Sequence, residues 1–244
     1  MQFAIRRDVS LATYEQDLEG LGGVPTEIAL PHRMDECQKH ADQLPALAAF
    51  LKQAGILCPS VHAPQGRLSD DGFLSWAGET VRFAEAVGAG SVVFHPERVT
   101  ALQRPAFQLR ALKHLLALRR DTRVRVAVET FGSRKCVLTP EELGERELWM
   151  VLDTSHLFQQ RTLDLIERYH ATIAAVHLSE QRKDATGEVR PHLPVESFGI
   201  DVLTLLKEKK WCGTVTLEYL PEYHDRLLPD RAALEALFDN RKDA

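Results

Sequence analysis

The stretch Met150-Val151-Leu152-Asp153 is a short apolar run that ends in a side chain able to bind a metal ion. Five other runs end in the same way, in a histidine or an acid: Ser60-Val61-His62, Val92-Val93-Phe94-His95, Val126-Ala127-Val128-Glu129, Ala174-Ala175-Val176-His177 and Val215-Thr216-Leu217-Glu218. A seventh run, Glu27-Ile28-Ala29-Leu30-Pro31-His32, has the same form, but nothing else supports His32 as a ligand. A buried acid or histidine costs free energy unless something binds it. Several of them at the same end of successive strands therefore indicate a common centre, which we expect to be a metal site.

Apolar strand-like segments alternate with helix-like segments along the whole chain. The expected strands cover residues 3–5, 26–30, 57–62, 91–95, 123–129, 148–153, 173–178 and 213–218. The expected helices lie in residues 35–54, 69–87, 101–119, 162–169, 202–210 and 229–240, and a short one starts at 139–142. Alternating units of this kind form a parallel sheet, whose buried strands read as continuous apolar runs. A doubly wound open sheet is the alternative, but the glycine-rich turns typical of its early strands are absent. We therefore predict an α/β fold, a (β/α)8 TIM barrel.

Length and composition are consistent with a single domain over residues 1–244. The chain has 244 residues, and one such barrel typically takes about 250. No low-complexity linker or charge block divides it. The longest irregular stretch, residues 180–197, is rich in Arg, Lys, Pro and His. Long loops in compact domains are usually functional.

Charge and cysteine content exclude several classes of protein. The net charge is -5, so no global basic field favours nucleic acid or an anionic membrane. The four cysteines form no CxxC pair, which disfavours a disulfide scaffold or a thiolate zinc site. The N-terminal residues lack the apolar segment of a signal peptide, and no apolar run reaches the roughly 18 residues of a membrane span. We expect a cytoplasmic protein with no membrane partner.

The strand-end side chains define the expected site. Active sites of these barrels lie at the C-terminal ends of the strands, where six side chains would converge: His62, His95, Glu129, Asp153, His177 and Glu218. Imidazole and carboxylate without thiolate suit Zn²⁺, Mn²⁺, Co²⁺ or Fe²⁺. A single strand-end histidine is more often a hydrogen-bonded core residue, but that explanation weakens when six coincide. The segment Asp153-Thr154-Ser155-His156 adds an imidazole one turn beyond a strand-end carboxylate.

In the same order, these motifs resemble those of the xylose isomerase-like TIM barrel superfamily, which contains sugar-phosphate isomerases and epimerases together with endonuclease IV. The resemblance covers nearly the whole chain and rests on Val61-His62-Ala63-Pro64, Phe94-His95-Pro96, Val128-Glu129-Thr130, Leu152-Asp153-Thr154-Ser155-His156, Val176-His177-Leu178-Ser179-Glu180 and Leu217-Glu218.

Resemblance to the isomerase and epimerase branch implies a divalent-metal enzyme acting on a sugar or sugar derivative. One ion, Mn²⁺ or Zn²⁺ with Mg²⁺, Co²⁺ and Fe²⁺ as further options, would be held by Glu129, Asp153, His177 and Glu218. Glu129 and Glu218 would also be the catalytic acid/base pair, moving a proton through an enediolate. Substrate oxygens would be bound by four further side chains: His62, His95, His156 and Arg182. This is the leading prediction.

Resemblance to endonuclease IV implies a zinc-dependent phosphodiesterase acting at abasic sites, and only this alternative makes nucleic acid a partner. Its three-zinc cluster would use His62, His95, His156 and His192 as additional metal ligands. Where that branch has an Asp-x-His pair, this chain has Arg190-Pro191-His192, so one expected carboxylate is missing. A third hypothesis is a barrel that binds a sugar-like ligand or a partner without turnover, because fold and site can outlast activity.

Overall fold

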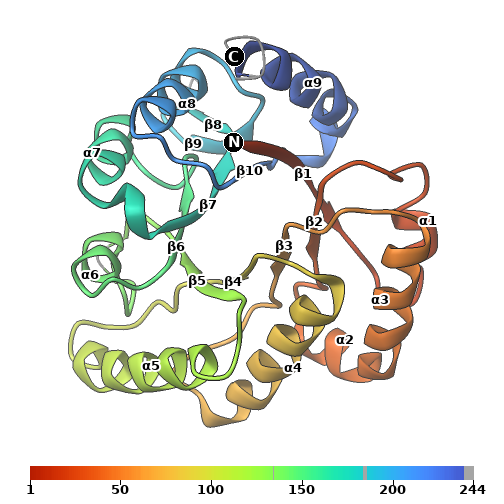
Figure 1. The fold of residues 1–244 in the computed structure, drawn as a ribbon. Helices are drawn as coiled ribbons and strands as arrows, with labels where there is room; N and C mark the ends of the chain where they lie inside the picture. The colour runs from red at the N-terminus through yellow and green to blue at the C-terminus, as the bar shows by residue number, and fades with distance from the viewer. Residues whose placement is uncertain (134, 184–185, 239–244) are drawn as a thin grey trace.

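Parallel strands close into a barrel that is surrounded by helices (Figure 1). The computed structural model describes residues 1–133, 135–183 and 186–238. In this part of the chain the ring contains eight strands in the order β1, β2, β3, β4, β5, β6, β7, β10, and β10 pairs with β1 to close it. Their bounds are β1 (Gln2–Asp8), β2 (Thr26–Ala29), β3 (Ser60–His62), β4 (Ser91–Phe94), β5 (Arg125–Glu129), β6 (Met150–Asp153), β7 (Ile173–Leu178) and β10 (Thr214–Leu217). The predicted (β/α)8 barrel is confirmed.

The α-helices alternate with the strands as expected, except that α1 was not predicted, and local signals set several of their boundaries. They are α1 (Tyr14–Asp17), α2 (Met34–Lys39), α3 (Leu44–Gln53), α4 (Asp71–Val87), α5 (Arg104–Arg119), α6 (Pro140–Glu145), α7 (Gln159–Tyr169), α8 (Ser197–Glu208) and α9 (Leu227–Phe238). Asp70 caps α4 by accepting a hydrogen bond from the Gly72 N–H, and Gly88 ends this helix in the left-handed conformation. Thr139 and Glu142 form a capping box at the start of α6. The last two residues of the predicted helix over 229–240 lie outside the described residues.

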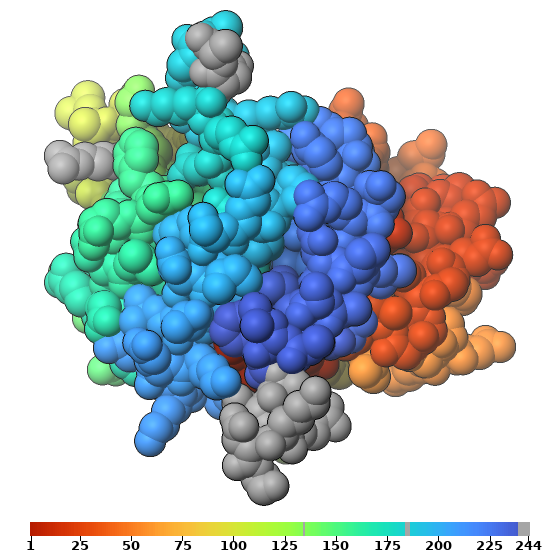
Figure 2. Space-filling model, turned by 90° about the horizontal axis from the view of Figure 1, so that it is seen from above, coloured from red at the N-terminus to blue at the C-terminus, as the bar shows by residue number. Residues whose placement is uncertain are grey.

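Two predicted segments differ from the structure. The helix expected over residues 35–54 is broken into α2, a 3-10 turn at Ala41–Gln43, and α3. Pro45 explains the break, because proline cannot donate an amide hydrogen bond inside a helix but fits the first turn of a new one. The irregular stretch expected over 180–197 contains an antiparallel hairpin of β8 (Glu180–Lys183) and β9 (Val189–Leu193). In Figure 2 this cyan segment projects above the barrel.

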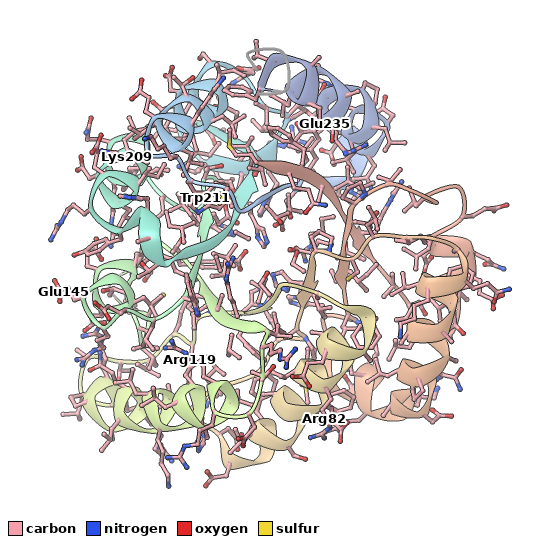
Figure 3. The ribbon with its side chains drawn as sticks, viewed as in Figure 1. Arg82, Arg119, Glu145, Lys209, Trp211 and Glu235 are labelled. Carbon is pink, nitrogen blue, oxygen red and sulfur yellow. The ribbon has the colours of Figure 1, made fainter. Side chains whose placement is uncertain are left out.

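The barrel core has two layers because alternate strand residues face opposite sides. Outward-facing residues such as Val92, Leu152 and Val176 join the large cluster between strands and helices. A smaller cluster consists of Val93, Ala127, Val151, Ala174 and Ala175, with Trp149 against it, and all of these except Ala174 lie on the inward-facing side of their strands by the period of two. Two positions beyond Val93, Ala127, Val151 and Ala175 along their strands come His95, Glu129, Asp153 and His177. The period of two therefore places the ligand-type side chains directly above the apolar interior, and Figure 3 shows side chains pointing into the ring.

Trp211, labelled in Figure 3, belongs to helix-to-barrel packing. Its indole Nε1–H donates to the Ile173 carbonyl at 2.9 Å, and its ring covers Gly213 so closely that a Cβ there would lie 2.3 Å from it. No helix in the described part of the chain is long and apolar enough to cross a membrane.

Candidate metal centre

The predicted ligands meet at the C-terminal end of the barrel. His62, Glu129 and Asp153 are the last residues of β3, β5 and β6, and His177 is the penultimate residue of β7. His95 and Glu218 directly follow β4 and β10. His62, Glu129, Asp153 and His177 are buried, and the side chains of His95 and Glu218 are only 15% and 14% exposed. Side chains of this kind pack together only if their polar atoms find partners.

Four of these residues form the central group, with one ligand atom from each within 4.8 Å of all the others: Glu129, Asp153, His177 and Glu218. The His177 Nδ1 atom lies 2.8 Å from Glu129 Oε1 and 3.0 Å from Glu218 Oε2. Burial alone would lower the pKa of His177, but the neighbouring carboxylates of Glu27 and Glu218 raise it well above its ordinary value. The positively charged imidazole thus offsets part of the negative charge of the carboxylates around it.

Asp153 is oriented so that one oxygen is free for a ligand. Its Oδ1 accepts hydrogen bonds from the Ser155 N–H at 2.7 Å, the Ser155 hydroxyl at 2.8 Å and the His156 N–H at 3.2 Å. Its Oδ2 is buried and has no hydrogen-bond partner among the described residues. Burial raises the pKa of Asp153, and the nearby Glu129 carboxylate raises it further. A cation at Oδ2 would relieve both effects.

Two flanking groups each share a carboxylate with the central group. His62 and His95 join Glu129, with His62 Nε2 at 3.8 Å and His95 Nε2 at 3.5 Å from its carboxylate oxygens. His156 and His192 join Asp153, and His156 Nε2 lies 3.7 Å from Oδ2. The three groups are therefore linked in a row through two shared carboxylates. His62 Nε2 is itself buried without a hydrogen-bond partner among the described residues.

The charges of this cluster also fit bound metal. Four buried or nearly buried carboxylates meet here, namely Glu27, Glu129, Asp153 and Glu218. Arg6 is the guanidinium that faces them, with Nη1 at 2.6 Å from Glu218 Oε1. Arg6 and a protonated His177 together balance two of these four carboxylates, and the negative charge that remains is costly away from water. Divalent cations would balance it, and a donor set of imidazole and carboxylate without thiolate suits Zn²⁺ or Mn²⁺.

Glu27 and Arg6 are site residues that the sequence analysis did not identify. Glu27 is fully buried within β2, and its carboxylate lies 3.1 Å from His177 Nε2 and 2.5 Å from the Ser60 hydroxyl. The sequence signal that could have found Glu27 is its position as an acid inside an apolar strand, because a buried carboxylate without a partner costs free energy. Arg6 was missed because the predicted first strand ended at residue 5, whereas β1 continues to Asp8 and directs Arg6 to Glu218.

Arg182 and His32 lie outside the three ligand groups. The Arg182 guanidinium is bound to both Glu196 carboxylate oxygens at 2.7 and 2.8 Å, and its side chain is 64% exposed. The structure thus pairs the predicted substrate-binding Arg182 with a carboxylate of the chain itself. The His32 ring stands edge-on to the His95 ring with centroids 5.7 Å apart. His192, by contrast, lies beside Asp153 and His156.

Comparison with known proteins identifies the family. The sequence model described as "Xylose isomerase-like TIM barrel" matches residues 27–239. No curated protein sequence matches the chain.

Solved structures of proteins named as an epimerase, an endonuclease and a dehydratase share the fold. A D-tagatose 3-epimerase-like protein is 17% identical with a TM-score of 0.72, and the match covers 100% of both chains. Endonuclease IV from Thermus thermophilus is 19% identical with a TM-score of 0.66, over 97% of this chain and 100% of that one. The probable 3-DHS dehydratase AsbF from Bacillus anthracis is 14% identical with a TM-score of 0.67, over 96% and 98%. The extent of the family match shows that this chain belongs to the xylose isomerase-like TIM barrel family.

Proposed function

We propose that this protein is a divalent-metal enzyme whose centre takes more than one ion and whose reaction is the hydrolysis of a phosphate ester. Glu129, Asp153, His177 and Glu218 would hold the central ion, Zn²⁺ or Mn²⁺. The observation that carries the proposal is the row of three ligand groups joined by the shared carboxylates of Glu129 and Asp153. Neighbouring divalent ions supply an activated water and neutralise charge on a phosphoryl group during displacement.

The burial of His62 supports a metal role for the flanking groups. Only 1% of His62 is exposed, so a substrate hydroxyl has little access to it. Its Nε2, which has no hydrogen-bond partner among the described residues, lies 3.8 Å from Glu129 Oε1, and the ring centroids of His62 and His95 are 4.5 Å apart. Two imidazoles and a carboxylate around one point form a zinc-type donor set. His62 therefore suits an ion better than a sugar oxygen.

The ionisation of the two glutamates points the same way. Burial raises the pKa of Glu218, but Arg6 and His177 lower it well below its usual range, and hydrogen bonding to His177 does the same for Glu129. A carboxylate with a low pKa remains ionised and ligates metal well, but it is a weak general base. Both residues are thus held in the ionised form that metal ligation requires.

The sugar isomerase or epimerase predicted first from the sequence is the second candidate. One specific observation favours it: the Glu129 and Glu218 carboxylates approach the same His177 Nδ1 from β5 and β10, on different sides of the barrel. In this reaction they would exchange a substrate C–H proton with solvent from opposite sides.

One pair of assays separates the candidates. The zinc-loaded protein is given phosphate mono- and diesters, including an abasic oligonucleotide, and a sugar panel is incubated in D₂O. We expect phosphate-ester hydrolysis and no deuterium incorporation into the sugars. Deuterium incorporation that is lost in Glu129→Gln and Glu218→Gln, without any hydrolysis, would overturn the hydrolase proposal in favour of the isomerase.

A further inference from the structure

A polar hollow opens directly beside the first flanking metal group. Its volume is about 530 Å³, and its lining includes Arg67, His95, Arg98 and Phe131. His95 belongs both to this hollow and to the group it forms with His62 and Glu129. A substrate bound to the metal centre would therefore extend into this space. Its size is in the range of small-molecule sites, roughly 300–1,000 Å³.

Tertiary contacts fix the loop that carries Arg67. The buried Glu97 carboxylate accepts hydrogen bonds from the Ser69 hydroxyl at 2.9 Å and the Ser69 N–H at 3.3 Å. From α5, the His114 ring bonds the Leu68 carbonyl through Nδ1 at 2.7 Å. Gly66 lies against Phe73, where a Cβ would come within 2.0 Å of the ring. The loop backbone is thus held from three sides while the Arg67 side chain remains exposed.

The segment that carries Arg98 is fixed as well. The Val137 N–H donates to the Glu97 carbonyl at 2.7 Å, and the Val99 N–H donates to the Lys135 carbonyl at 2.9 Å. The Arg98 guanidinium lies 5.4 Å from the centre of the Phe131 ring. Phe131 in turn stacks on His156 of the second flanking group, with ring centroids 4.0 Å apart. An aromatic platform therefore connects this arginine to the metal centre.

Both guanidinium groups lack a carboxylate partner among the described residues, and the Arg98 guanidinium also lies beside the Cys136 thiol. Among the described residues, no carboxylate lies within ion-pair distance of Arg67 or Arg98, whereas Arg104 and Arg161 are paired with Glu142 and Glu141. The carboxylate in the hollow, Glu97, accepts hydrogen bonds from Ser69 and is not paired with either arginine. Two arginines at one hollow can bind a phosphate or carboxylate through their paired N–H groups.

We propose that the hollow lined by Arg67 and Arg98 is an anion subsite, so that the substrate carries a phosphate or carboxylate group besides the part that reaches the metal centre. The inference rests on the proposed function in one respect, because the metal centre is taken as the place of reaction. An anion subsite in addition to the metal centre narrows the substrate class to small molecules that carry more than one anionic group, and the volume of the hollow is large enough for such molecules.

The test is calorimetric titration of the zinc-loaded full chain with inorganic phosphate. We compare the wild-type protein with the double variant Arg67→Gln/Arg98→Gln and with the control Arg110→Gln. Arg110 lies over Phe107 on the exposed side of α5, 4.6 Å from the ring centre, so it matches Arg98 in setting but lies outside the hollow. Zinc content verifies that each variant keeps its metal centre. Titration with acetate shows whether the subsite prefers phosphate or carboxylate.

The double variant is expected to lose one phosphate site per chain, or to bind there at least about tenfold more weakly, as the loss of charge-assisted hydrogen bonds implies. The control should bind as the wild type does. Unchanged phosphate binding in the double variant would overturn the subsite, whatever reaction the enzyme catalyses. Loss of the site without any phosphate-ester hydrolysis by the wild type would keep the subsite and refute the hydrolase.

Discussion

His177 is held by carboxylates on both of its ring nitrogens, and this arrangement would direct the nitrogen that we propose as a metal ligand. Glu27 faces Nε2, whereas Glu129 and Glu218 face Nδ1. If Nε2 donates to Glu27, the lone pair of Nδ1 points to the central group. Glu27 is in turn fixed by the Ser60 hydroxyl. Carboxylates that orient a histidine ligand in this way increase its basicity.

Replacing Glu27 by Gln should weaken zinc binding by roughly 10- to 100-fold, the usual effect of losing such an orienting carboxylate. The measurement is competition for zinc against a chelator of known affinity. Glu97→Gln is the matched control, because Glu97 is also a buried carboxylate bound to a serine but belongs to none of the ligand groups. Equal zinc affinity in Glu27→Gln and the control would show that Glu27 does not position His177.

The site residues that could be predicted are those whose role follows from the sequence of a single strand. His62, Glu129 and Asp153 end apolar runs, so period two and the barrel rule suffice to bring them together. Glu27 carried a local signal, as an acid inside an apolar run, but its partner His177 and the partnership of Arg6 with Glu218 follow only from the closed ring of strands. The reaction also could not be predicted from local sequence patterns. Our proposal for it rests on how deeply His62 and Asp153 are buried and on which of their atoms lack hydrogen-bond partners among the described residues.

At the scale of elements, polar strands and broken helices were the hardest to predict. β8 contains Glu180-Gln181-Arg182-Lys183, which has no apolar alternation, so its pairing with β9 left no trace in the sequence. That pairing places Arg182 beside Glu196. The break before α3 was marked by Pro45, a local signal that the apolar periodicity of residues 35–54 outweighed in the prediction.

Two helical glycines should respond oppositely to alanine. A Cβ at Gly78 in α4 would meet only Arg82 Nη1 at 3.7 Å, whereas a Cβ at Gly199 in α8 would meet Val195 Cγ1 at 2.6 Å. Gly78→Ala should raise the free energy of unfolding by about 0.5–1 kcal/mol through helix propensity. Gly199→Ala should lower it by about 1–3 kcal/mol through overpacking. Urea unfolding measures both free energies. A Gly199→Ala protein that is more stable than the wild type would show that Val195 moves aside without cost, and would contradict the prediction of overpacking.

At the scale of the whole molecule, bound metal should contribute to stability. The carboxylates of Glu27, Glu129, Asp153 and Glu218 converge from β2, β5, β6 and the end of β10, so their repulsion acts across the ring. Removing the metal with EDTA should lower the unfolding temperature by several degrees, and added zinc should restore it, because a ligand at 100 times its Kd stabilises by about 2.7 kcal/mol. Differential scanning calorimetry makes the measurement. An EDTA-treated protein that melts as the zinc-loaded one does would mean that these carboxylates are balanced without metal.

The barrel itself is shared by proteins named for different reactions, so the fold alone does not decide the reaction. For this chain, the two candidate reactions that we propose differ in the number of ions that the centre would hold. A centre with one ion leaves the flanking histidines to substrate, as in the isomerase reaction, whereas linked ions use them as ligands.

The most direct test of this account is the metal content of the protein, measured by elemental analysis after zinc loading and removal of unbound metal. The three linked ligand groups predict two or three zinc ions per chain. His62→Ala should lower the count by one, because it removes a ligand from the first flanking group while leaving the four ligands of the central group. One ion per chain, unchanged in His62→Ala, would contradict the account.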